Sequence, residues 1–103
     1  MTDLASFQRE IDRVRRERGF TTEPTRLLTL IVEELGEVAR EIKRTWSPNY
    51  DAFDPDRLAP ELADTFVLLA ALASEFKIDL GDAVQLKFFA ADSQRQWPSS
   101  EHS

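Results

Sequence analysis

Acidic side chains in two short clusters give this chain its clearest capacity for chemistry. The first cluster consists of Glu33, Glu34 and Glu37, and the second of Glu61 and Asp64. Glu34 and Glu37 are three residues apart, which places them one turn apart on the same face of a helix, and the second cluster repeats this spacing. Carboxylate oxygens presented in this way are the ligands that hard divalent cations prefer in proteins.

The composition removes most other catalytic chemistries. The chain contains no Cys, and its one His, His102, is the second-last residue. Thiolate zinc sites, iron–sulfur clusters and cysteine nucleophiles are therefore excluded, and catalysis by histidine is not expected. Carboxylates, Arg, Lys and hydroxyl groups remain for polar chemistry.

The chain has the size and composition of one globular domain. It has 103 residues, of which 42% are apolar and 31% are charged. We expect one domain over residues 1–98 and a loose tail over residues 99–103. The N-terminus has no basic segment followed by an apolar stretch, and the longest apolar run, residues 66–73, is far shorter than the roughly 20 residues that span a bilayer. We therefore expect a cytoplasmic protein with no membrane partner.

Negative charge is concentrated in the middle of the chain. The net charge is −6, and residues 31–82 carry twelve acidic and five basic side chains. Such a surface repels a phosphate backbone, so no nucleic-acid partner is expected. A polyphosphate can still bind if the carboxylates first capture a divalent metal.

Hydrophobic periodicity predicts an all-α fold of four helices. Apolar residues recur at spacings of three and four, and no segment alternates in the manner of a strand. We expect the third helix to begin between Leu58 and Pro60, because proline is tolerated in the first turn of a helix. The other helices are expected over about residues 3–18, 25–45 and 80–93.

Local signals support the ends of these helices. Gly19 is a natural stop for the first helix, and Asp79 with Asp82 three positions later resembles an N-cap that opens the fourth. Cations suit the C-terminal end of a helix dipole, and the first helix carries there Arg13, Arg15, Arg16 and Arg18.

The third helix contains a segment that has no polar face. Residues 66–73 are apolar on every face of the helix, and the helix is expected to end at about residue 76. A helix of this kind is buried on all sides, and a chain of this length offers few elements that can cover it. We expect the chain to form oligomers through this helix, as a homodimer or a homotetramer.

An antiparallel pairing of the second and third helices brings the two acidic clusters to the same level. Four or five carboxylates then converge at the edge of the core, where they repel one another unless some are protonated or a divalent cation binds. The alternative interpretation is a solvated acidic helix face. Gly36, within the first cluster, costs a helix about 1 kcal/mol relative to Ala, so a close approach of backbone or ligand is a reason for its presence.

These residues resemble the MazG-like, all-α nucleoside triphosphate pyrophosphohydrolases. The family signature is E-E-x-x-E on one helix and E-x-x-D on the next, and the two acidic clusters match it with 23 residues between Glu37 and Glu61. The segments "RGF…P…LL", "ELADTFVLLAALA" and "IDLGDAVQLK" are also similar to family segments. The resemblance covers about residues 4–98 and implies a MazG-like four-helix bundle.

The resemblance implies Mg²⁺-dependent hydrolysis of a ribo- or deoxyribonucleoside triphosphate to monophosphate and pyrophosphate, with Mn²⁺ as a substitute metal. Nucleotide-pool housecleaning is the implied role. Carried over by position, Glu33 is a catalytic residue that either adds a ligand or orients the attacking water as a base. Glu34 combines a catalytic role with metal binding, and the further metal ligands are Glu37, Glu61 and Asp64.

The last helix departs from the family pattern. Relatives often end with Lys-x-x-x-Asn-x-x-Arg for phosphate and substrate contacts, whereas here Lys87 is followed by Ala91 at the Asn position and by Arg95 one place late. Lys87 and Arg95 are candidate phosphate ligands, with an exposed surface pair as the alternative. Phe20 and Trp46 are candidates for stacking on the base, with core packing as the alternative.

Two further functions remain open from the sequence. A metal- and nucleotide-binding helical module with weak or no catalysis is supported by the missing Asn. A plain acidic oligomerisation bundle requires the carboxylates to face water.

Overall fold

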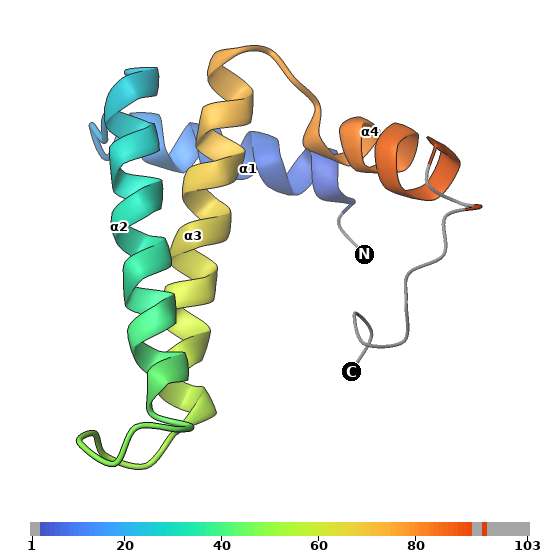
Figure 1. The fold of residues 1–103 in the computed structure, drawn as a ribbon. Helices are drawn as coiled ribbons and strands as arrows, with labels where there is room; N and C mark the ends of the chain where they lie inside the picture. Colours follow the sequence, from blue (N-terminus) through green and yellow to red (C-terminus); the bar gives the residue numbers. More distant parts are fainter. Residues whose placement is uncertain (1–2, 92–93, 95–103) are drawn as a thin grey trace.

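The computed structural model describes residues 3–91 and residue 94, and every regular element in that part of the chain is helical. The predicted all-α class is confirmed, and no helix in the described part is long and apolar enough to cross a membrane. Helices α2 and α3 lie side by side as an antiparallel hairpin, and α1 crosses them near the end opposite their connecting loop (Figure 1). The elements are α1 (Leu4–Glu17), α2 (Pro24–Lys43), α3 (Pro55–Glu75), α4 (Leu80–Val84) and the π-helix η1 (Gln85–Ala91).

Acidic side chains cap the N-terminal ends of the first two helices. The Asp3 carboxylate accepts a hydrogen bond from the Ser6 N–H at 2.7 Å and caps α1. At the start of α2, the Glu23 carboxylate accepts from the backbone N–H groups of Thr25 and Arg26, while Pro24 occupies the first helical position. Proline fits there because its missing N–H has no partner in the first turn of a helix.

The predicted start of the third helix is wrong by about one turn. Helix α3 begins at Pro55, because the Asp54 carboxylate accepts from the Asp56 N–H at 2.9 Å and Pro55 supplies the first helical φ angle. Pro60 therefore lies inside the helix and not in its first turn. Two prolines five residues apart both fit a helix start, and the capping aspartate decides between them.

A single buried side chain attaches the connector before α4 to α1. The Gln8 amide donates to the Ile78 carbonyl at 2.8 Å and to the Ser74 hydroxyl at 3.1 Å, and its oxygen accepts from the Leu80 N–H at 2.8 Å. The Asp79 carboxylate then caps α4 by accepting from the Asp82 N–H at 3.0 Å, as predicted. As a result α4 packs against α1 (Figure 1).

The predicted fourth α-helix is shorter than expected. The α-helical pattern ends at Val84, and residues 85–91 form the π-helix η1. An N-cap signal locates the start of a helix, but it does not determine the hydrogen-bond spacing further along. In residues 85–91 this spacing widens from the four residues of an α-helix to the five residues of a π-helix.

The core lies between α2 and α3 and is small. It consists of Leu27, Ile31, Leu68 and Ala71, with Leu72 packed against it. Within the described residues, Leu27 is the one large side chain that is fully buried. Large apolar side chains stay exposed along α2 and α3, among them Leu28, Val32, Leu35, Ile42, Leu62 and Leu69.

Candidate metal centre and adjoining cleft

Carboxylates from the two helices of the hairpin meet at one level. Glu34 on α2 and Glu61 and Asp64 on α3 each offer an oxygen, and the three oxygens all lie within 4.8 Å of one another. The antiparallel pairing of α2 and α3 produces this arrangement, since the middle of α2 then faces the early part of α3 (Figure 1). Glu34 and Glu61 are half-buried and Asp64 is exposed, so the group lies at the edge of the core.

The convergence of these carboxylates raises the pKa of Glu34. Its pKa is raised, first by a hydrogen bond with the Glu61 carboxyl group, then by removal from water and by the negative charges of Glu61, Asp64 and Glu37. Its Oε2 atom is buried and has no hydrogen-bond partner in the described part of the chain. A buried oxygen without a partner is costly, and without a cation the cluster favours a protonated Glu34.

The donor set fits a hard divalent cation. Three carboxylates supply oxygens from two rigid helices, and the orphaned Glu34 oxygen lacks the kind of partner that a cation provides. Binding a cation would relieve the repulsion that raises the pKa of Glu34. The group therefore differs from an ordinary solvated acidic face, in which every carboxylate oxygen has access to water.

The two remaining acidic candidates lie outside this group. Glu37 is exposed on α2, and its charge contributes to the raised pKa of Glu34. Glu33 is also exposed on α2, beside Glu34 in the sequence. The structure thus brings three of the five predicted carboxylates together and leaves two on the neighbouring surface.

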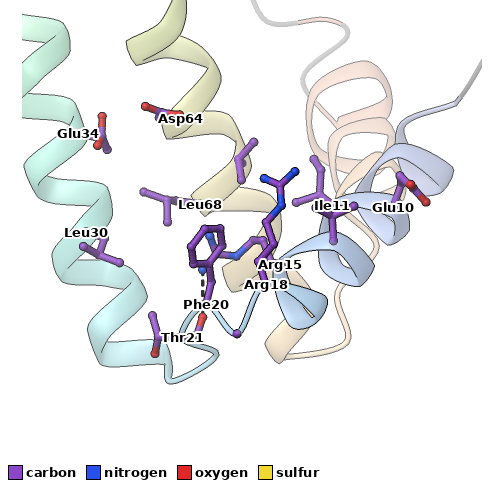
Figure 2. Close-up of a pocket in the computed structure, with 13 residues that line it drawn as sticks. Glu10, Ile11, Arg15, Arg18, Phe20, Thr21, Leu30, Glu34, Asp64 and Leu68 are labelled. Carbon is purple, nitrogen blue, oxygen red and sulfur yellow. Dashed lines mark hydrogen bonds between the residues drawn. The ribbon is translucent and has the colours of Figure 1, made fainter.

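A cleft of about 790 Å³ connects the carboxylates to the end of α1. Glu34 and Asp64 line one part of the cleft, Leu30 and Leu68 its middle, and the Phe20 ring the part farther from the carboxylates (Figure 2). Its volume lies in the range of pockets that hold small molecules. Of the predicted base-stacking residues, Phe20 therefore faces the same cavity as the carboxylates.

Other predicted substrate-binding residues lie elsewhere or are not described. Trp46 does not line the cleft; it follows the end of α2, is 70% exposed, and has the Lys43 ammonium 5.9 Å from its ring centroid. Lys87 belongs to η1, which packs with α4, and it does not line the cleft either. Arg95 and residues 99–103 lie outside the described residues.

Two arginines on the wall of the cleft are absent from the sequence-based set of site residues. Arg15 and Arg18 both line the cavity, although their sequence context indicated only a favourable position in the helix dipole. A usable signal exists, because Arg15 follows Ile11 by four residues and Arg18 follows Val14 by four. Both arginines therefore continue the apolar rows of α1 onto the face that lines the cleft.

Among the described residues, no side chain or backbone approaches Gly36 closely. A methyl group added at this position would meet no atom within 4 Å apart from its chain neighbours and its own helix backbone. The residue is exposed on α2, so the described part of the chain leaves open space where a neighbour was expected.

Comparisons with known proteins agree with the geometry. The MazG nucleotide pyrophosphohydrolase domain family matches residues 22–88, a range that contains all five acidic candidates. YpjD of Bacillus subtilis (strain 168), which carries the description "uncharacterized protein", is 30% identical over 105 residues, covering 95% of this chain and 93% of that protein. No solved structure gives a significant match. The family match and the near full-length similarity together show that this chain belongs to the MazG nucleotide pyrophosphohydrolase domain family.

Proposed function

We propose that the protein hydrolyses nucleoside triphosphates to the monophosphate and pyrophosphate with the help of Mg²⁺, for which Mn²⁺ can substitute. The observation that carries this proposal is the group Glu34, Glu61 and Asp64, whose oxygens converge at one end of a cleft large enough for a nucleotide. The family membership supports the same class of reaction.

The carboxylates hold the metal and the attacking water in this proposal. Glu34, Glu61 and Asp64 are the central ligands, and Glu37 adds an oxygen from the next turn of α2. When bound, the cation neutralises charge on the phosphates and polarises their oxygens. The oxygen of the attacking water would form a bond to one of the two phosphorus atoms as the bridging P–O bond between the α- and β-phosphates breaks. Monophosphate and pyrophosphate would then separate, and the proton of the water would pass to a carboxylate.

Glu33 has two roles open to it. It either orients the attacking water and accepts its proton, or it adds a further ligand. Its exposure beside Glu34 is compatible with both roles, because neither requires burial in the core. Little covalent chemistry is required of the protein in phosphoryl transfer, so the absence of Cys and of an internal His is no obstacle.

The nucleoside occupies the remainder of the cleft in this arrangement. Phe20 is proposed to stack on the base, supported by its place in the same cavity as the carboxylates. Lys87, Arg95 and Trp46 are proposed as further substrate contacts. Because Lys87 and Trp46 do not line the cleft of their own chain, a second copy of the chain would have to supply them.

We further propose that the protein assembles as a homodimer or a homotetramer through α3 and the apolar side chains beside it. Leu69 is 44% exposed in the middle of the apolar segment of α3, and Leu62 on the same helix is exposed too. The Cα radius of gyration is 16.4 Å, against about 13 Å for a compact domain of 100 residues. An extended chain with uncovered apolar rows on its central hairpin is best completed by its own copies.

Housecleaning of the cytoplasmic nucleotide pool is the role that we propose for this reaction. A metal- and nucleotide-binding module with weak or no catalysis is the alternative. It is favoured by Ala91, which stands where relatives often carry the Asn that contacts substrate.

The test is pyrophosphate release from a panel of ribo- and deoxyribonucleoside triphosphates, with Mg²⁺ and with chelator. Metal-dependent release from any member supports the enzyme and ranks the bases. Absence of release from every member, in a protein that still binds Mn²⁺, supports the binding module instead.

A further inference from the structure

The turn after α1 fixes the place of Phe20. Gly19 has a φ angle of +71°, in the left-handed region that glycine adopts without steric cost. The Gly19 N–H donates to the Arg16 carbonyl at 3.1 Å, and the Phe20 N–H donates to the Arg15 carbonyl at 3.0 Å. This pair of bonds is the Schellman motif, in which the residue after the glycine commonly makes an apolar contact with the residue whose carbonyl it caps.

Arg15 occupies the position of that apolar contact. Its guanidinium lies over the Phe20 ring, with Cζ 5.2 Å from the ring centroid, and its Nη2 donates to the Thr21 carbonyl at 3.0 Å. Arg15 is half-buried, and a cation–π contact strengthens when it is removed from water. The one side chain therefore ties two successive residues of the connector back to α1.

The Phe20 ring is supported by Arg15 but not enclosed. It remains 50% exposed, and it lines the cleft that leads to Glu34 and Asp64 (Figure 2). An aromatic ring that is held against a guanidinium, and still open to a cavity, is suited to stack on a second flat group.

Resting on the proposed nucleotide hydrolysis, we infer that Arg15 is a positioning residue that holds Phe20 in the orientation in which its uncovered surface stacks on the base of the substrate. The phosphates of that substrate lie at the carboxylates. The cleft consequently selects nucleoside triphosphates over polyphosphates that lack a base. Arg15 acts through Phe20 and Thr21 and needs no contact with the substrate.

A purely structural role for Arg15 makes a different prediction. If the contact only caps α1, its loss lowers the stability of the helix and leaves the preference between ligands unchanged. The ratio of two affinities separates the roles, because unfolding of part of the sample weakens both ligands in proportion.

The experiment is calorimetric titration of the full chain in Mg²⁺ with two kinds of probe. One is a set of α,β-imido deoxynucleoside triphosphates of the four bases, which resist cleavage between the α- and β-phosphates, and the other is inorganic tripolyphosphate. Phe20→Leu keeps an apolar cap contact and removes the ring, while Arg15→Met removes the guanidinium. Arg9→Met is the matched control, since Arg9 lies on α1, bonds to the Ser6 hydroxyl at 3.0 Å and does not line the cleft.

We expect Phe20→Leu to weaken nucleotide binding roughly tenfold and Arg15→Met to weaken it roughly two- to fivefold, with tripolyphosphate unaffected. Arg15→Lys keeps a cation and is expected to fall between wild type and Arg15→Met, which provides a reading if Arg15→Met folds poorly. Equal losses for both probes, no loss for the nucleotides, or the same loss in Arg9→Met would each overturn the inference. Failure of the proposed hydrolysis is seen separately, as absent pyrophosphate release with the affinity ratio intact.

Discussion

Glu34 is the residue at which packing and electrostatics conflict. The hairpin buries its Oε2 atom, which has no hydrogen-bond partner among residues 3–91, and the negative charges of three other carboxylates act on the group. Core packing alone gives no reason for such a residue, because an apolar side chain at this position would avoid the cost. In the proposed function a bound cation would resolve this conflict, so Glu34 would link the stability of the fold to the occupancy of the site.

The stability of the metal-free protein should therefore depend on Glu34 and on pH. Since the folded-state pKa of Glu34 is raised, its stabilising contribution is present below the unfolded pKa, about 4.3, and is lost as pH rises through the folded value. Urea unfolding in chelator between pH 4 and pH 8 measures this loss. We expect Glu34→Gln to lose less stability over that interval than wild type, and added Mg²⁺ to restore the wild type at high pH. Parallel pH profiles in chelator would show that Glu34 is an ordinary surface carboxylate.

Removal of one proposed metal ligand, Asp64, should separate function from folding. In Asp64→Asn the charge near Glu34 falls, so we expect unchanged or slightly higher stability without metal. Turnover should fall by roughly 100-fold or more, because metal stabilisation of a transition state is worth several kcal/mol. Asp56→Asn is the control on the same helix, exposed and in its first turn. Pyrophosphate release and Mn²⁺ binding measure the effect, and an active Asp64→Asn protein would remove Asp64 from the ligand set.

At the scale of the elements, a buried ion pair helps to set the register of the hairpin. Glu41 on α2 is 9% exposed and accepts from the Arg44 Nε at 3.0 Å, while the Arg57 Nε from the first turn of α3 lies 3.9 Å away. Asp51 in the connecting loop lies within 4.0 Å of both arginines. These contacts join the loop to both helices, two turns after Glu34 on α2 and one turn before Glu61 on α3, and so support the alignment of Glu34 with Glu61 and Asp64.

The sequence predicted the elements better than the surfaces they share. Helix periodicity and caps such as Asp79 gave the all-α class and most boundaries, because these signals are local. The choice between Pro55 and Pro60 depended on a capping interaction by Asp54 that periodicity does not encode. Arg15 was missed for a different reason: its role comes from a turn that folds Phe20 back over the helix, which residue spacing along one helix cannot reveal.

Two glycines, Gly36 within α2 and Gly19 after α1, should respond in opposite ways to substitution by alanine. Gly36→Ala should stabilise the protein by up to about 1 kcal/mol, since a methyl group there meets open space in the middle of a helix. Gly19→Ala should destabilise it by roughly 1 kcal/mol, because its φ of +71° is strained for any residue with a Cβ. Urea denaturation measures both changes. A destabilised Gly36→Ala protein would instead point to a close neighbour supplied by a second copy of the chain.

At the scale of the whole molecule, the described part of the chain leaves apolar side chains of its central hairpin exposed. Leu28, Leu35 and Ile42 recur along α2 at intervals of seven, and all three are exposed. Ile31 follows Leu28 by three residues and precedes Leu35 by four, so helical spacing assigns it to the same apolar stripe, but α3 buries Ile31 together with Leu27 and not the other three. Periodicity indicates that a face is apolar, but it does not indicate which element covers that face.

A charge placed on the exposed apolar side chains of α3 should break the proposed assembly and, with it, the activity. Leu69→Lys puts an ammonium group in the middle of the apolar segment of α3, where a second copy would have to desolvate it at a cost of several kcal/mol. We expect wild type to sediment at a multiple of the 11.8 kDa chain mass and Leu69→Lys to shift toward the single chain. Asn49→Lys, in the exposed loop between α2 and α3, adds the same charge and should leave the mass of the particle unchanged.

Because Lys87 and Trp46 do not line the cleft of their own chain, turnover should fall with the loss of the oligomer. A fully active single chain would show instead that the cleft works without a partner, and that these two residues do not take part in the reaction.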